Sequence, residues 1–134
     1  AYWRGGDRDR AAEAFQEVLR MDSDCLDALK ALASLAVERE DHQQALDYQA
    51  RLIELGERTP ELFYNTGLLL QRSGQIEDAV RLYREALNER PNFAEALLNL
   101  GHALKAQGDG DAARNCWKQA LEARPELAAG YFEG

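Results

Sequence analysis

The sequence predicts an all-α fold, an α-solenoid built from antiparallel helix-turn-helix hairpins. Three observations predict it: a repeat with a fixed period, apolar residues at helical spacing, and turns of only a few residues. The period is 34 residues, because four alanines recur at that interval: Ala11, Ala45, Ala79 and Ala113. A period of this length marks one supersecondary unit that buries its apolar face by stacking on its neighbours.

The first helix of each period has recognisable start and stop signals. Thr59 is suited to the N-cap and Pro60 to the first helical position. Gly74 ends this helix, because glycine takes the left-handed conformation at a helix end without a Cβ penalty. The first helix of the next period has a different start signal, since Asn92 and Glu95 have the spacing of a capping pair.

The second helix of each period carries apolar residues at helical spacing and ends before Pro91. Gly67 on the first helix and Ala79 on the second lie on apolar faces, where a missing side chain lets the two backbones approach closely. Tyr83 fills the space nearby. The same pattern recurs one period later at Gly101, Ala113 and Trp117.

The composition is that of a soluble, folded protein and disfavours several kinds of partner. Of the 134 residues, 46% are hydrophobic, and no apolar run approaches the roughly 20 residues that cross a bilayer, so we expect no membrane insertion. The net charge of −8 argues against nucleic acid, whose phosphates need Lys and Arg, and mildly favours a basic peptide. No charged-then-apolar leader follows Ala1, so the compartment is unknown, with the cytoplasm slightly favoured.

The sequence carries no pattern typical of catalysis, metal binding or cofactor binding. His42 and His102 have no second ligand at metal spacing, and Cys25 and Cys116 belong to no CxxC pair. Residues 108–111 (GDGD) align with a turn between helices and lack the distal glutamate of a calcium loop. We therefore expect no enzyme activity, no cofactor, no metal and reduced thiols.

Over essentially its whole length, the chain resembles the tetratricopeptide repeat family. One clear copy is carried by residues 63–67 (FYNTG), Gly74, Ala79, Tyr83, Ala86 and Pro91. A second is carried by residues 97–101 (LLNLG), Gly108, Ala113, Trp117, Ala120 and Pro125. The resemblance implies that the hairpins form a right-handed superhelix.

The resemblance divides the chain, as a single array over residues 1–134, into unequal repeats. They are 1–25 (a partial repeat with the second helix only), 26–59 (a degenerate repeat), 60–93 and 94–127 (clear repeats), and 128–134 (the start of a further first helix). The degenerate repeat has Ala33 in place of the glycine, Glu40 at the turn, Gln49 in place of the large aromatic residue and Glu57 in place of the proline.

The partial repeats at both ends indicate a piece of a longer protein. Tyr2 and Trp3 would be the tail of a preceding first helix, with a turn at Gly6, and Tyr131 aligns with Phe63 in a following one. Because an unstacked repeat exposes a hydrophobic edge, the alternative is a short array that self-associates through its uncapped ends.

In tetratricopeptide arrays the first helices line a concave groove, and the resemblance implies the same here. The predicted groove residues are Lys30, Ser34, Tyr64, Asn65, Leu68, Gln71, Arg72, Leu98, Asn99, His102 and Lys105.

Two features of this groove leave alternatives open. Tyr64 and Leu68 either form an apolar patch for a ligand or fill the gap between adjacent first helices. Asn65 and Asn99 either bond a peptide backbone, which resembles the asparagine ladder of the O-linked N-acetylglucosamine transferases, or tie neighbouring helices together. The family's carboxylate clamp, which grips the C-terminal tails of chaperones, is disfavoured because Glu95 would repel a ligand carboxylate.

The predicted function is a protein–protein interaction scaffold that binds a peptide or protein segment of unknown identity in the groove. The alternative is a substrate-docking arm of a larger enzyme, such as a glycosyltransferase. The fold does not decide between them, because one scaffold serves many functions.

Overall fold

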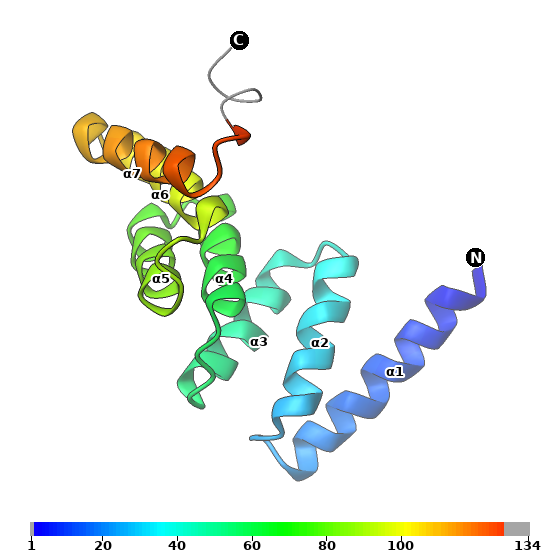
Figure 1. Ribbon diagram of the computed structural model, residues 1–134. Coiled ribbons are helices and arrows are strands. Elements are labelled where there is room, and N and C mark those ends of the chain that lie inside the picture. The colour runs from blue at the N-terminus through cyan, green and yellow to red at the C-terminus, as the bar shows by residue number, and fades with distance from the viewer. Residues whose placement is uncertain (1, 128–134) are drawn as a thin grey trace. The chain divides into compact units, whose positions relative to one another are not determined.

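The computed structural model describes residues 2–127, which form seven helices and no strand (Figure 1). The all-α prediction is confirmed. The chain divides into two compact units, residues 1–57 and 58–134. The helices are α1 (Tyr2–Met21), α2 (Leu26–Glu38) and α3 (His42–Glu54) in the first unit, and α4 (Pro60–Arg72), α5 (Ile76–Glu89), α6 (Ala94–Ala106) and α7 (Gly110–Ala123) in the second. None of the helices in the described range is long and apolar enough to cross a membrane.

In the first unit, α1 is one continuous helix from Tyr2 to Met21. The sequence-based prediction of a turn at Gly6 is therefore wrong. A glycine inside a helix costs only about 1 kcal/mol relative to alanine, and each added residue gains a backbone hydrogen bond, so the helix continues through Gly5 and Gly6. The predicted start of a further first helix at Tyr131 lies outside the described residues.

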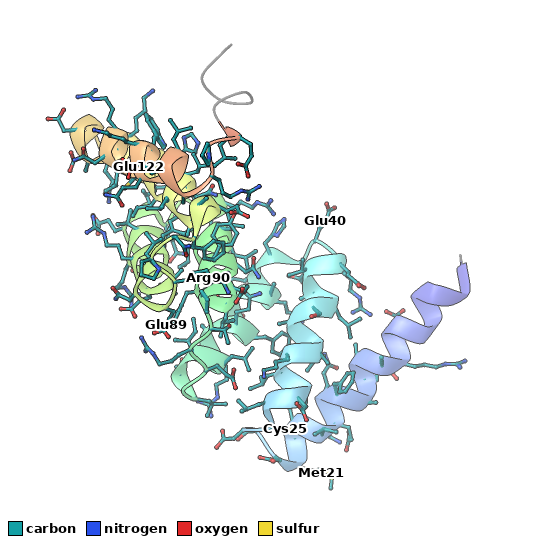
Figure 2. All side chains as sticks on the ribbon, in the orientation of Figure 1. Met21, Cys25, Glu40, Glu89, Arg90 and Glu122 are labelled. Atoms are coloured by element: carbon teal, nitrogen blue, oxygen red, sulfur yellow. The ribbon has the colours of Figure 1, made fainter. Side chains whose placement is uncertain are left out.

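The helices α2 and α3 form the hairpin predicted for the degenerate repeat. Glu40 occupies the turn with a positive φ of 58°, the conformation that glycine takes at the equivalent turns (Figure 2). Asp41 then caps α3, because its carboxylate accepts a hydrogen bond of 3.1 Å from the backbone N–H of Gln44. The hairpin therefore forms without the glycine that ends the first helix in the clear repeats.

In the second unit, α4 packs on α5 and α6 packs on α7 as antiparallel pairs (Figure 1). Thr59 caps α4 as predicted, with its hydroxyl accepting from the N–H of Leu62 at 3.2 Å. The predicted capping pair at Asn92 is wrong. The N-cap of α6 is Phe93, which makes no side-chain cap, and Glu95 instead forms an ion pair with an arginine beyond α7.

The close approach predicted at Gly67 and Gly101 is confirmed. Each of these glycines lies against the ring of the large aromatic residue on the second helix of its own hairpin, Tyr83 and Trp117 respectively. The facing residue Ala79 is fully buried. The two hairpins of the second unit therefore share one packing arrangement, repeated at the period of the sequence.

Candidate functional site

The predicted groove residues are divided between the two units. Lys30 and Ser34 lie on α2, and both are exposed. Lys30 is engaged within its own unit, because its Nζ lies 3.6 Å from Glu57 Oε1. The other nine residues lie on the first helices of the second unit, α4 and α6, which contact each other. The site is therefore described on these two helices.

Tyr64 on α4 is half-buried and packed against two other aromatic rings. Its ring centre lies 5.0 Å from that of Phe93 and 6.1 Å from that of Tyr83, and both pairs are tilted. Its hydroxyl oxygen accepts a hydrogen bond of 3.1 Å from the amide of Asn99. Tyr64 thus fills the space between adjacent elements, and this was one of the two alternatives that the sequence left open.

Asn99 on α6 ties the two first helices together. Its Nδ2 donates to Tyr64 Oη across to α4 and, at 2.8 Å, to the backbone carbonyl of Glu95 in its own helix. Both amide hydrogens are therefore used within the unit. Asn65, one period earlier, is exposed on α4. The two asparagines thus have different surroundings, although their positions in the repeat are equivalent.

Leu98 does not line a groove, and the prediction that it does is wrong. Its side chain is only 4% exposed and belongs to a core cluster with Leu97 and Ala120, against which Leu127 also packs. Leu127 lies just after α7, so this segment covers a side of α6 that the repeat pattern leaves open. Leu68, at a neighbouring place on α4, remains partly exposed.

Near the end of α4, Tyr83 of the second helix α5 contacts the first helix through its hydroxyl group. Tyr83 Oη donates a hydrogen bond of 2.6 Å to Gln71 Oε1. Burial raises the pKa of Tyr83, the charge of Tyr64 adds to the rise, and Arg72 opposes it. The hydroxyl therefore stays protonated and remains a donor. Arg72 itself is exposed.

In the next hairpin, the residue equivalent to Tyr83 is Trp117 on α7, which is only half-buried. Its Nε1 donates to the carbonyl of Leu98 at 3.3 Å. The ring of His102 lies 5.5 Å from it, and Lys105 Nζ lies 5.9 Å from its centre. His102 and Lys105 are exposed, so this end of α6 presents an aromatic surface flanked by a cation.

The opposite ends of α4 and α6 carry ion pairs that the sequence analysis missed. Arg90 lies in the connection between α5 and α6 (Figure 2). Its guanidinium group lies 2.5 Å from the carboxylate of Glu61. One period later, Arg124 lies 3.0 Å from Glu95. The backbone N–H of Glu61 and then the Arg90 hydrogen bond lower the pKa of that carboxyl. Each ion pair joins the start of a first helix to the residue just after the following second helix. In the sequence, an Arg-Pro dipeptide follows both second helices, and this recurrence could have predicted the ion pairs.

No group of three or more His, Cys, Asp or Glu side chains within the described range is placed to hold a metal ion. Cys25 and Cys116 are free thiols, each half-buried. Burial raises the pKa of the Cys116 thiol, with Arg84 opposing and Asp109 adding to the shift.

Stacked helical hairpins with a repeated glycine–aromatic contact define an α-helical repeat protein. Two family models, both described as tetratricopeptide repeat, match residues 1–60 and 70–131. The chain belongs to the tetratricopeptide repeat family.

Two curated relatives of this chain are much larger than it is. Protein O-mannosyl-transferase TMTC1 of Homo sapiens is 26% identical over 125 residues, which cover 90% of this chain and 14% of that protein. The heat shock protein sti1 homolog of Schizosaccharomyces pombe is 30% identical over 94 residues, covering 70% of this chain and 16% of that protein. The chain therefore spans a small part of the curated relatives it matches.

Among solved structures, a crystal structure of MamA has a TM-score of 0.78 and 26% sequence identity, covering 96% of this chain and 75% of that one. A second MamA structure, from AMB-1, has a TM-score of 0.83 at 21% identity, with coverage of 96% and 72%. The second likeness bears on the fold alone. Both support the repeat architecture.

Proposed function

We propose that the chain is a protein-interaction scaffold that binds a peptide or protein segment on the first helices of its second unit. Tetratricopeptide repeat proteins are generally scaffolds of this kind. We define the α4/α6 face by eight residues: Tyr64, Asn65, Leu68, Gln71, Arg72, Asn99, His102 and Lys105. The observation that carries the proposal is that this face combines an exposed amide with a partly exposed leucine, neither of which contributes to the glycine–aromatic contacts of the hairpins.

The residues of the face have two kinds of role. Tyr64 and Asn99 hold α4 and α6 together, so they set the shape of the surface. Asn65 and Leu68 meet the ligand. An exposed amide can donate to and accept from a peptide backbone at once, and Leu68 adds apolar area one helical turn away.

The test is a peptide-array screen of the whole chain, followed by the variants Asn65→Ala and Leu68→Ser. Both variants should weaken the binding of any specific ligand that the array identifies. Gln119→Ala is the matched control, because it removes an exposed amide from the second helix α7. If Asn65→Ala and Leu68→Ser bind as well as the control, the ligand does not use this face.

A second candidate function is a substrate-docking arm of a larger enzyme. It is favoured by the similarity to Protein O-mannosyl-transferase TMTC1, of which this chain spans 14%. In a full-length protein of that kind, Leu68→Ser should raise the KM for a protein substrate while leaving turnover of a small acceptor unchanged. Equal effects on both substrates would argue against docking.

Self-association is a further proposal about partners, supported by the apolar surface of α1. Val18 is 39% exposed and Met21 is 84% exposed. Covering them with a second copy would remove this area from water. Light scattering over a range of concentrations should show a mass that rises with concentration, and Met21→Glu should reduce the rise. A constant monomer mass would reject this proposal.

A further inference from the structure

The last turns of α4 and α6 each carry a cation that has no carboxylate partner among the described residues. Arg72 lies in the last turn of α4 and Lys105 in the last turn of α6, and both are exposed. The charge of Arg72 acts on the Tyr83 hydroxyl, and Lys105 lies over the ring of Trp117. Lys105 therefore lies beside the large aromatic residue of its hairpin, and Arg72 directly follows Gln71, which is hydrogen-bonded to Tyr83. We call Arg72 and Lys105 the basic rim.

Most other cations in the described part of the second unit are paired with carboxylates. At the opposite end of the α4/α6 face, Glu61 and Glu95 are each paired with an arginine. Five arginines of the described part of this unit form ion pairs with carboxylates: Arg58, Arg81, Arg90, Arg114 and Arg124. Apart from the basic rim, the cations of that part without such a partner are Arg84 and Lys118, which lie on the second helices α5 and α7.

The α4/α6 face thus presents two cations without ion-pair partners at one end, while the carboxylates of Glu61 and Glu95 beside its other end are paired with arginines. We infer that the segment bound on this face carries aspartate or glutamate side chains where it passes the basic rim. This inference rests on the proposed function and specifies the partner's chemistry. The net charge of −8 would favour a basic partner, but charges more than about 8 Å away are largely screened at physiological ionic strength. Within that range the rim contributes two exposed cations that form no ion pair among the described residues.

The surroundings of the rim favour such contacts. The last turn of each helix carries partial negative charge on its free carbonyls, which keeps the two cations near the helix ends before any partner arrives. Contact with Trp117 further limits the positions that Lys105 can take. Less side-chain freedom is then lost when a carboxylate binds. Exposed ion pairs are weak, so the two together should change Kd by about two- to twentyfold.

The experiment uses three pools of short fluorescent peptides that share the same apolar positions and carry Glu, Gln or Lys at the others. Fluorescence polarisation with the whole chain at low and high salt measures their binding. The Glu pool should bind tightest, and its advantage should shrink at high salt. The double variant Arg72→Gln/Lys105→Gln should weaken the Glu pool by about two- to twentyfold. The matched control Arg84→Gln/Lys118→Gln makes the same change in net charge on α5 and α7 and should leave binding within about twofold.

The outcomes separate this inference from the proposed function. If the Gln or Lys pool binds tightest and loses affinity in Asn65→Ala and Leu68→Ser, the acidic preference is wrong while the binding face stands. If no pool responds to those two variants, the proposed function fails and this inference with it. If both double variants lose the same affinity for the Glu pool, the effect is one of net charge, and the inference about the basic rim is wrong. The inference is also wrong if a single-stranded oligonucleotide binds the basic rim more tightly than the Glu pool does.

Discussion

Gly67 of α4 and Tyr83 of α5 lie so close together that no side chain fits between them. A Cβ built on Gly67 would lie 2.7 Å from Tyr83 Cε1 and 2.8 Å from Cδ1. The ring cannot move away, because Tyr83 is fully buried and its hydroxyl is bonded to Gln71. The relationship recurs one period later, where a Cβ on Gly101 would lie 2.5 Å from Trp117 Cδ1.

The first prediction concerns this contact. Gly67→Ala gains up to about 1 kcal/mol of helix propensity, but overpacking costs about 1–3 kcal/mol, so the variant should lose roughly 1–2 kcal/mol of unfolding free energy. Urea denaturation measures it. Gly110→Ala is the control, because a Cβ there meets only Arg114 Nη1 at 3.7 Å, and it should stay within about 0.5 kcal/mol of the parent. A Gly67→Ala protein as stable as the parent would contradict the packing.

This contact also explains why the sequence predicted the second unit so well. A glycine, a facing alanine and a large aromatic residue are needed together, so their recurrence at one period determines where both helices of a hairpin lie. The predictions at Gly6 and Asn92 were wrong because each relied on a local signal. A glycine only weakens a helix, and a capping pair competes with other partners of its side chains, such as Arg124 for Glu95.

The candidate site was less predictable, because it depends on what covers each side chain. Periodicity placed Leu98 beside the groove, but Leu127 packs into the same cluster and Leu98 is buried. Periodicity also treated Asn65 and Asn99 as equivalent. Asn99 is partly buried because Tyr64 reaches it from α4, whereas Asn65 is exposed. Such pairings join residues about one period apart in different helices or segments, and the repeat pattern does not reveal them.

The second prediction concerns the turn between α2 and α3. Glu40 has a φ of 58°, a conformation that costs a residue with a Cβ about 1–2 kcal/mol. Glu40→Gly removes this strain but adds backbone freedom to the unfolded chain, so it should stabilise by about 0.5–1 kcal/mol. Gly74→Ala is the reverse change at the equivalent turn, with a φ of 82°, and should destabilise by about 1–2 kcal/mol. Thermal and urea unfolding measure both variants. A loss of stability in Glu40→Gly would show that the turn is not strained.

The third prediction concerns alkaline pH. Burial raises the pKa of Tyr83 above the ordinary value of about 10. The unfolded chain therefore releases this proton at a lower pH than the native protein does. The stabilising contribution is fully present below about pH 10 and is lost as the pH rises from there towards the folded-state pKa.

Tyr83→Phe should therefore show a shallower fall in unfolding free energy above about pH 10 than the parent. At neutral pH it should cost about 1 kcal/mol, because the hydrogen bond to Gln71 is lost. Urea midpoints at neutral and alkaline pH measure both effects, with Tyr48→Phe on α3 as the control. Parallel pH curves for Tyr83→Phe and the parent would rule out the buried hydroxyl as a source of the fall.

The fourth prediction distinguishes the two asparagines. Asn99→Ala removes both the hydrogen bond to Tyr64 and the one to the Glu95 carbonyl, so it should destabilise by about 1–2 kcal/mol. Asn65→Ala changes an exposed side chain and should stay within about 0.5 kcal/mol. Urea denaturation of both single variants measures the difference. If the two cost the same, Asn99 does not tie α4 to α6, and the surface on which ligand binding is proposed lacks its main polar link.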